Sequence, residues 1–132
     1  MKGKYLLTFA GLSGAVSVML GAFAAHALKA KLPEYLLEVF QTGVQYQLLH
    51  TLAILACGIL LQLKVSPKAQ KYFLIAAICF IIGILCFSGS LYALALTGIK
   101  WFGPITPLGG LLFIIGWGMF SVAALKMNEV TK

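Results

Sequence analysis

The stretch YFLIAAICFIIGILCFSGSLYALALTGI, residues 72–99, contains no aspartate, glutamate, lysine or arginine. It is longer than the roughly 20 apolar residues that an α-helix needs to cross about 30 Å of hydrocarbon. A run of this length and composition indicates a membrane-spanning helix. The fold class of the chain therefore depends on whether other runs of this kind accompany it.

Three further windows lack charged residues, at 5–28, 39–63 and 101–125. Of the 132 residues, 61% are hydrophobic and only 10% are charged, too few for the charged shell of a soluble domain. We therefore predict an all-α membrane protein, a four-transmembrane-helix bundle that forms a single integral membrane domain over residues 1–132. The predicted spans are about 6–28, 44–63, 72–97 and 105–125.

The net charge of +7 comes from ten basic residues that are all lysines and lie near the ends of the predicted spans. In this setting lysines mark topology and contact anionic lipid headgroups. No basic groove interleaved with aromatic residues is present, so we predict no nucleic-acid partner. The positive-inside rule predicts that both termini are cytoplasmic, because three segments carry Lys2, Lys4, Lys64, Lys68, Lys71, Lys126 and Lys132, against Lys29, Lys31 and Lys100 in the other two loops.

The first apolar run also resembles a signal peptide, with Ala25-His26-Ala27 as a small-x-small cleavage site. The charge-free window at 5–28 is longer than the ~7–15 residues of a signal's apolar core. We therefore expect this run to be retained as a span.

Small side chains recur at intervals of four along the first span, and such ridges let helix backbones approach closely in lipid. We predict that the first span is the helix around which the others pack, and that the third span has a similar ridge. The predicted packing residues are Ser13, Ser17, Gly21, Ala25, Gly89 and Ala93.

Pro33 suits the first turn of a new helix. The next polar residues, Glu34, Glu38, Gln41 and Gln45, fall within about 60° of arc on that helix. This pattern predicts a short amphipathic segment that lies at or rises from the outer interface and continues as the second span.

Polar side chains gather in the half of the bundle predicted to face outward. Each needs a hydrogen-bond partner, because an unsatisfied polar group in hydrocarbon costs several kcal/mol. Two interpretations fit: an interhelical network that fixes helix register, or a hydrated pocket open to the outer face. The candidate ligand-binding residues are His26, Gln45, Tyr46, His50, Ser88, Ser90 and Tyr92.

The two histidines are candidates for a shared ligand. From the predicted span ends, His26 lies about 3 Å deep and His50 about 9 Å, an offset that side chains can bridge. A b-type haem or a metal ion is therefore an alternative. No aspartate, glutamate or suitably placed cysteine supplies a third ligand, so we predict no metal site and no cofactor.

Nothing in the sequence indicates catalysis. The segment FSGS, residues 87–90, lacks the strand-turn-helix setting of a nucleophile elbow. No carboxylate lies within the predicted spans to orient a histidine base. We therefore predict that the protein is not an enzyme.

Four motifs, GAFAAHAL, QTGVQYQLLHTLAIL, FSGSLYALALTG and ITPLGGLLFIIGW, resemble those of small bacterial inner-membrane proteins of the YgdD/YwdK type. These form domain-of-unknown-function family 423, an uncharacterised membrane protein family. The resemblance covers nearly the whole chain and implies a four-span protein of the bacterial cytoplasmic (inner) membrane, without an established activity. The family's pattern falls on Gly21, His26, Gln45, Tyr46, His50, Ser88, Gly89, Ser90, Tyr92, Thr106, Pro107, Gly109, Gly110 and Trp117.

This sequence departs from the pattern at two positions. Ala24 stands where many relatives have glycine, and Gln47 stands where some have histidine. If that histidine were a required ligand, its absence would count against a haem or metal site.

We expect a non-enzymatic, multi-pass protein that binds a lipid, a small amphiphile or a protein partner through the outer polar cluster. One alternative is a small transporter or channel component that uses the same cluster. A second is a haem-binding redox subunit with His26 and His50 as ligands. Membrane lipids are the expected partners, and a homo-oligomer or a complex with another membrane protein is compatible with the pattern.

Overall fold

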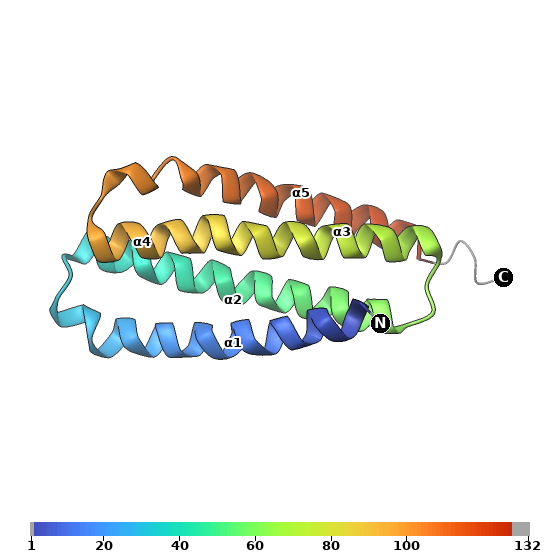
Figure 1. Ribbon diagram of the computed structural model, residues 1–132, viewed down its shortest axis with the longest axis horizontal. Helices are drawn as coiled ribbons and strands as arrows, with labels where there is room; N and C mark the ends of the chain where they lie inside the picture. Colours follow the sequence, from blue (N-terminus) through green and yellow to red (C-terminus); the bar gives the residue numbers. More distant parts are fainter. Residues whose placement is uncertain (1, 128–132) are drawn as a thin grey trace.

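A computed structural model describes residues 2–127, and the predicted orientation marker Lys132 lies outside this range. The described chain is a bundle of antiparallel helical rods (Figure 1). Within it, four helical segments are long and apolar enough to cross a membrane: Lys2–Ala30, Glu34–Gln62, Pro67–Thr97 and Lys100–Leu125. The predicted four-helix membrane fold is therefore confirmed. The elements are α1 (Lys2–His26), η1 (Leu28–Ala30), α2 (Glu34–Gln62), α3 (Pro67–Gly83), η2 (Ile84–Ser88), α4 (Gly89–Thr97), η3 (Lys100–Phe102) and α5 (Ile105–Leu125).

The order of the helices across the bundle differs from the prediction. Helix α1 packs chiefly on α2, and α2 in turn packs on α3 and α4. Helix α5 packs on the other side, against α3 and η2. Figure 1 shows α1 and α5 at opposite edges, with α2 and the α3–α4 rod between them. The expectation that the first span is central was wrong, because its small residues allow close approach to one neighbour only.

The buried face of α1 follows intervals of three and four, not four alone. Its buried residues are Gly3, Leu6, Ala10, Ser13, Ser17 and Ala24. A row spaced strictly by four drifts around the helix by about 40° at each step, because each residue turns about 100°. Ser13 and Ser17 therefore lie in the contact, Gly21 is half-buried near Val44, and Ala25 is exposed.

Helix α2 is one continuous element from Glu34 to Gln62, with Pro33 as its N-cap residue. The segment predicted as amphipathic is thus its first part, continuous with the second span. Helix α2 begins well before residue 44, so the middle of the helix falls near His50. This placement sets the depth of every polar residue on α2.

The third rod contains a π-helical turn, η2, between α3 and α4. Such turns are wider than α-helix and often occur at functional sites. Gly109 of α5 lies directly against the backbone of Phe87 in this turn, and Ser88 Oγ donates a 2.7 Å hydrogen bond to the carbonyl oxygen of Gly43 on α2. The π turn therefore anchors the rod to both of its neighbours.

Two apolar clusters leave a polar layer between them. The larger cluster includes Leu6, Ile54, Phe73 and Phe80 and occupies the end of the bundle where α1 begins and α5 ends, which we call the lysine-rich end. The smaller cluster comprises Ala24, Leu28, Phe40 and Ala95 at the opposite end. The buried polar residues between the two clusters are Ser13, Ser17, Gln47, His50, Thr51, Ser88 and Ser90.

Candidate ligand-binding groove

A chain of side-chain hydrogen bonds crosses the middle of the bundle from α4 to α1. Tyr92 Oη donates to Gln47 Oε1 at 2.6 Å. Gln47 Nε2 donates to the backbone oxygen of Ser13 at 3.3 Å and to Ser13 Oγ at 3.1 Å. Ser13 Oγ and Thr51 Oγ1 are 2.7 Å apart. These groups satisfy one another away from water, so the chain fixes the register of α1, α2 and α4.

A second polar contact joins α2 to α5. Trp117 Nε1 donates to His50 Nε2 at 3.0 Å, and His50 Nδ1 lies 2.8 Å from the carbonyl oxygen of Tyr46. This pattern assigns a neutral imidazole with its proton on Nδ1, donating to Tyr46. The ring also stacks on Phe113, with centroids 3.6 Å apart and planes 8° from parallel. His50 is therefore held by contacts with α2 and α5, and its ring also lies 5.5 Å from the ring of Phe80 on α3.

Two depressions lie between α2 and α5, one on each side of the contact between His50 and Trp117. The larger depression, about 600 Å³, is lined by Tyr46, His50, Phe87, Pro107, Gly110, Leu111, Phe113, Ile114 and Trp117. The smaller, about 360 Å³, is lined by Leu49, His50, Leu52, Ala53, Ala56, Trp117 and Phe120. We call the larger depression the α2–α5 groove. The His50–Trp117 pair separates it from the smaller one.

The α2–α5 groove has an apolar, aromatic surface that opens toward the lipid. Ile114 is 70% exposed, Trp117 45% and Tyr46 38%. Pro107 and Gly110 lie in the first two turns of α5, so the groove runs from the end opposite the lysine-rich end to the middle of the bundle. A volume of this size is within the range of roughly 300–1,000 Å³ seen for small-molecule sites.

The structure distributes the seven predicted site residues among four settings. Tyr46 and His50 line the α2–α5 groove, and Tyr92 belongs to the hydrogen-bond chain. Ser88 and Ser90 join helices: Ser88 Oγ donates to the Gly43 carbonyl oxygen on α2, and Ser90 Oγ lies 2.5 Å from Thr106 Oγ1 on α5. Ser90 Oγ also donates to the Phe87 carbonyl oxygen of its own rod at 2.9 Å. The side chains of His26 and Gln45 are exposed and form no hydrogen bond with another described residue.

The two histidines do not share a site. Ser13 faces Thr51 and Phe23 faces Phe40, so the antiparallel register of α1 and α2 places His26 roughly 15–20 Å along the axis from His50. A metal–imidazole bond is about 2 Å long, so the two rings cannot ligate one iron. The predicted offset was too small because α2 begins at Glu34.

Three residues of this region were absent from the predicted site: Gln47, Thr51 and Trp117. Gln47, His50 and Thr51 follow an i, i+3, i+4 pattern, which would have shown that they share one helix face. A tryptophan in mid-span, away from the aromatic belt at the membrane surface, indicates a partner for its indole N–H inside the bundle. Phe87 and Phe113 carried no comparable signal among so many apolar residues.

The site offers hydrogen bonding and aromatic surface but no clustered acids or ligands. Within residues 2–127, no three histidine, cysteine, aspartate or glutamate side chains come together as a metal site would require. The described glutamates, Glu34 and Glu38, lie at the start of α2, far along the helix from His50. The chemistry of the α2–α5 groove therefore suits an apolar or amphiphilic molecule.

Known proteins resemble this chain over nearly its whole length. The family "Protein of unknown function (DUF423)" matches residues 20–110. The chain is 37% identical to the UPF0382 inner membrane protein YgdD of Escherichia coli (strain K12), over 98% of this chain and 95% of the relative. It is 43% identical to a UPF0382 membrane protein of Haemophilus influenzae (98% and 100%) and 42% identical to the UPF0382 membrane protein YwdK of Bacillus subtilis (strain 168) (93% and 98%). No solved structure matches.

These relatives are named as membrane proteins, and the E. coli relative as an inner membrane protein, in agreement with the four apolar helices. The chain therefore belongs to the DUF423 family of uncharacterised proteins and is a multi-pass protein of the bacterial inner membrane.

Proposed function

We propose that this protein binds, without catalysis, the acyl chain of a membrane lipid or small amphiphile in the α2–α5 groove. The observation that carries the proposal is an apolar, lipid-facing groove with a hydrogen-bonded His50–Trp117 pair at its inner end. The groove begins at Pro107, in the first turn of α5, so a molecule with its head at the membrane surface would reach the pair with its tail.

The lining of the groove favours an acyl chain over a polar solute. Leu111 and Ile114 form an apolar wall, and Tyr46 and Phe87, whose ring centroids are 4.7 Å apart with the planes tilted by 40°, form an aromatic one. Both ring nitrogens of His50 are already engaged, so the pair provides a defined end to the groove and needs no polar ligand to satisfy it.

Two further observations support binding over catalysis or transport. No described carboxylate orients His50, and both of its nitrogens are engaged, so it lacks the setting of a general base. Between the polar layer and the lysine-rich end, the core holds fully buried Ile54, Phe73 and Phe80. A hydrated path for an ion or polar solute would have to displace this packing.

We also infer that the lysine-rich end faces the cytoplasm. Within the described residues this end carries Lys2, Lys4, Lys64, Lys68, Lys71 and Lys126, whereas Lys29, Lys31 and Lys100 lie at the other end. The positive-inside rule then places the α2–α5 groove in the periplasmic leaflet. A second copy or another membrane protein is an alternative occupant of the groove.

Photo-crosslinking with a matched pair of variants tests the proposal. The full-length protein is reconstituted in vesicles that contain a phospholipid with a diazirine in its acyl chain. Gly110→Leu fills the groove, where a new Cβ would already lie 3.8 Å from Phe87, whereas Gly118→Leu on the same helix enters open space. Crosslinks should map to groove residues in the wild type and in Gly118→Leu, and fall severalfold in Gly110→Leu. Crosslinks spread evenly over the outer faces of all helices would contradict a specific site.

A further inference from the structure

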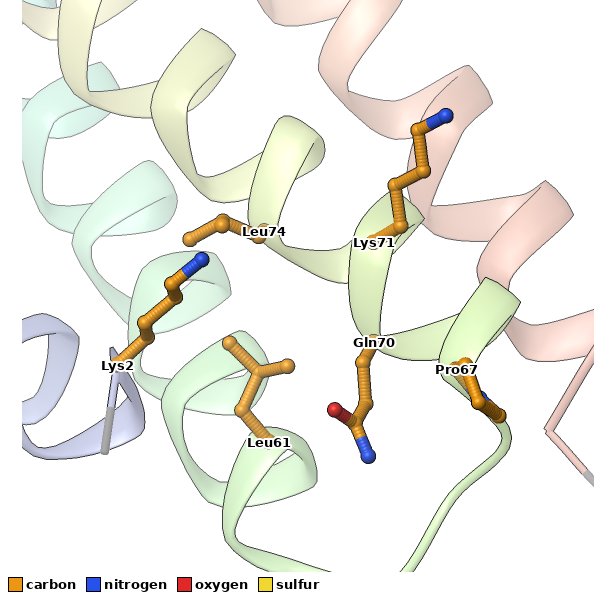
Figure 2. A pocket seen from close by; sticks show the side chains of 6 residues that line it. All are labelled: Lys2, Leu61, Pro67, Gln70, Lys71 and Leu74. Atoms are coloured by element: carbon orange, nitrogen blue, oxygen red, sulfur yellow. The ribbon is translucent and has the colours of Figure 1, made fainter.

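A separate pocket lies at the lysine-rich end, where α1, α2 and α3 meet. Its volume is about 470 Å³, and its lining comprises Lys2, Leu61, Pro67, Gln70, Lys71 and Leu74 (Figure 2). It shares no residue with the α2–α5 groove, so it requires an explanation of its own.

The backbone that positions this pocket is tightly fixed. Gly3 and Gly58 pack so closely that a Cβ on Gly58 would lie 3.2 Å from the carbonyl oxygen of Gly3, which holds Lys2 beside the last turn of α2. On the other side, Ser66 caps α3: its Oγ accepts from Ala69 N–H at 3.1 Å and donates to the Lys126 carbonyl oxygen at 2.6 Å. The two halves of the pocket therefore have a defined separation.

The polar rim is cationic and the wall is apolar. Figure 2 shows the ammonium group of Lys2 reaching beside Leu74, while Lys71 extends from the rim in a different direction on its flexible chain. Neither lysine forms an ion pair within the described residues, because Glu34 and Glu38 lie at the opposite end and Glu129 is outside the described range. Leu61 and Leu74 line the same pocket and supply its apolar wall.

Gln70 adds a neutral acceptor to the cationic rim. Its Nε2 donates to the Val65 carbonyl oxygen at 3.0 Å, which fixes the side-chain amide and leaves Oε1 without a described donor. An acceptor in a pocket that two lysines also line suits a ligand that combines a negative phosphate with hydroxyl donors.

We propose that this pocket is a binding site for the headgroup of an anionic glycerophospholipid. Its phosphate contacts Lys2 and also Lys71, whose exposed side chain turns toward the pocket on binding. A headgroup hydroxyl donates to Gln70 Oε1, and the start of an acyl chain packs on Leu61 and Leu74. The charge complementarity and the adjoining apolar wall together favour a lipid over a free anion, because a free anion gains nothing from the leucines. The pocket lies at the ends of three helical segments that are long and apolar enough to cross a membrane, where we expect lipid headgroups.

A pair of double variants tests the site. Lys2→Gln/Lys71→Gln removes two charges that line the pocket, and Lys64→Gln/Lys68→Gln removes two charges at the same end that do not. Dioleoyl-phosphatidylglycerol or dioleoyl-phosphatidylcholine is titrated into each full-length protein in neutral detergent. Lipid retention is measured by native mass spectrometry, and thermal stability is measured in parallel.

The expected result is that phosphatidylglycerol binds the wild type and Lys64→Gln/Lys68→Gln alike, and binds Lys2→Gln/Lys71→Gln about tenfold more weakly. Equal losses in both double variants would overturn the proposal in favour of diffuse surface charge. Unchanged binding in both would overturn it as well. If inorganic phosphate alone gives the same stabilisation and displaces the lipid, the site recognises a free anion and the lipid assignment is wrong.

Discussion

The indole N–H of Trp117 donates to His50 Nε2 across 3.0 Å, and this bond joins α5 to α2 at the inner end of the α2–α5 groove. It lies near the middle of both helices, at the depth where a hydrogen bond has least competition from water. The two helices otherwise pack on the α3–α4 rod more than on each other. The pair therefore controls how wide the groove is.

Trp117→Phe should destabilise the protein by about 1 kcal/mol, because it removes the donor to His50 Nε2 and keeps most of the aromatic contact with Phe80. The measurement is thermal unfolding in detergent. Trp101→Phe is the control, since Trp101 is 70% exposed at the end of the bundle. Similar losses for both tryptophans would mean that the His50 bond contributes nothing.

His50→Leu should lower the unfolding temperature more than His26→Leu. The first substitution leaves Trp117 Nε1 without its acceptor and disturbs the stack on Phe113, whereas the side chain of His26 is exposed and forms no hydrogen bond with a described residue. In the double variant His50→Leu/Trp117→Phe the losses should be less than additive, because both changes remove the same bond. Full additivity, or equal effects of the two single histidine changes, would contradict the assigned contact.

The sequence predicted the fold well because its strongest signal, four long windows without charge, depends only on composition. It predicted the polar residues but not their connections. Gln45 and Gln47 are equally polar in the sequence, yet Gln47 is buried against Ser13 and Gln45 is exposed. The two residues are two positions apart, so their side chains point about 200° apart around α2. Which of the two is buried depends on the face of α2 that α1 covers.

The groove itself could not be predicted, because it depends on the π-helical turn at Ile84–Ser88. That turn directs Phe87 toward Tyr46 and Gly109. No local pattern of residues in the sequence predicts a π-helical turn at this place. The predicted pairing of the two histidines was wrong for a related reason. Helix α2 begins ten residues earlier than the predicted span, which places His50 about 15 Å further from the start of the helix. Depth within a bundle is sensitive to helix boundaries, which hydropathy places only approximately.

Gly109→Ala should be strongly destabilising, while Gly110→Ala should be close to neutral. A Cβ on Gly109 would collide with the backbone nitrogen and Cα of Phe87, and backbone atoms in a packed turn cannot move aside as a side-chain end can. A Cβ on Gly110 would meet the Phe87 ring at 3.8 Å, an ordinary contact. We expect a loss of about 1–3 kcal/mol for Gly109→Ala, measured by thermal or denaturant unfolding in detergent. A smaller loss than that of Gly110→Ala would show that α5 does not approach η2 this closely.

A reporter fused after Lys132 should report a cytoplasmic C-terminus in intact cells. Green fluorescent protein matures in the cytoplasm, whereas alkaline phosphatase is active only after export, so the first fusion should fluoresce and the second should be inactive. The physical reason is the excess of lysines at the end where α1 begins and α5 ends, which resists translocation. Replacing Lys64, Lys68 and Lys71 by glutamine should weaken this bias, whereas replacing Lys29, Lys31 and Lys100 should strengthen it. An active phosphatase fusion on the unaltered chain would reverse the orientation and place the α2–α5 groove in the cytoplasmic leaflet.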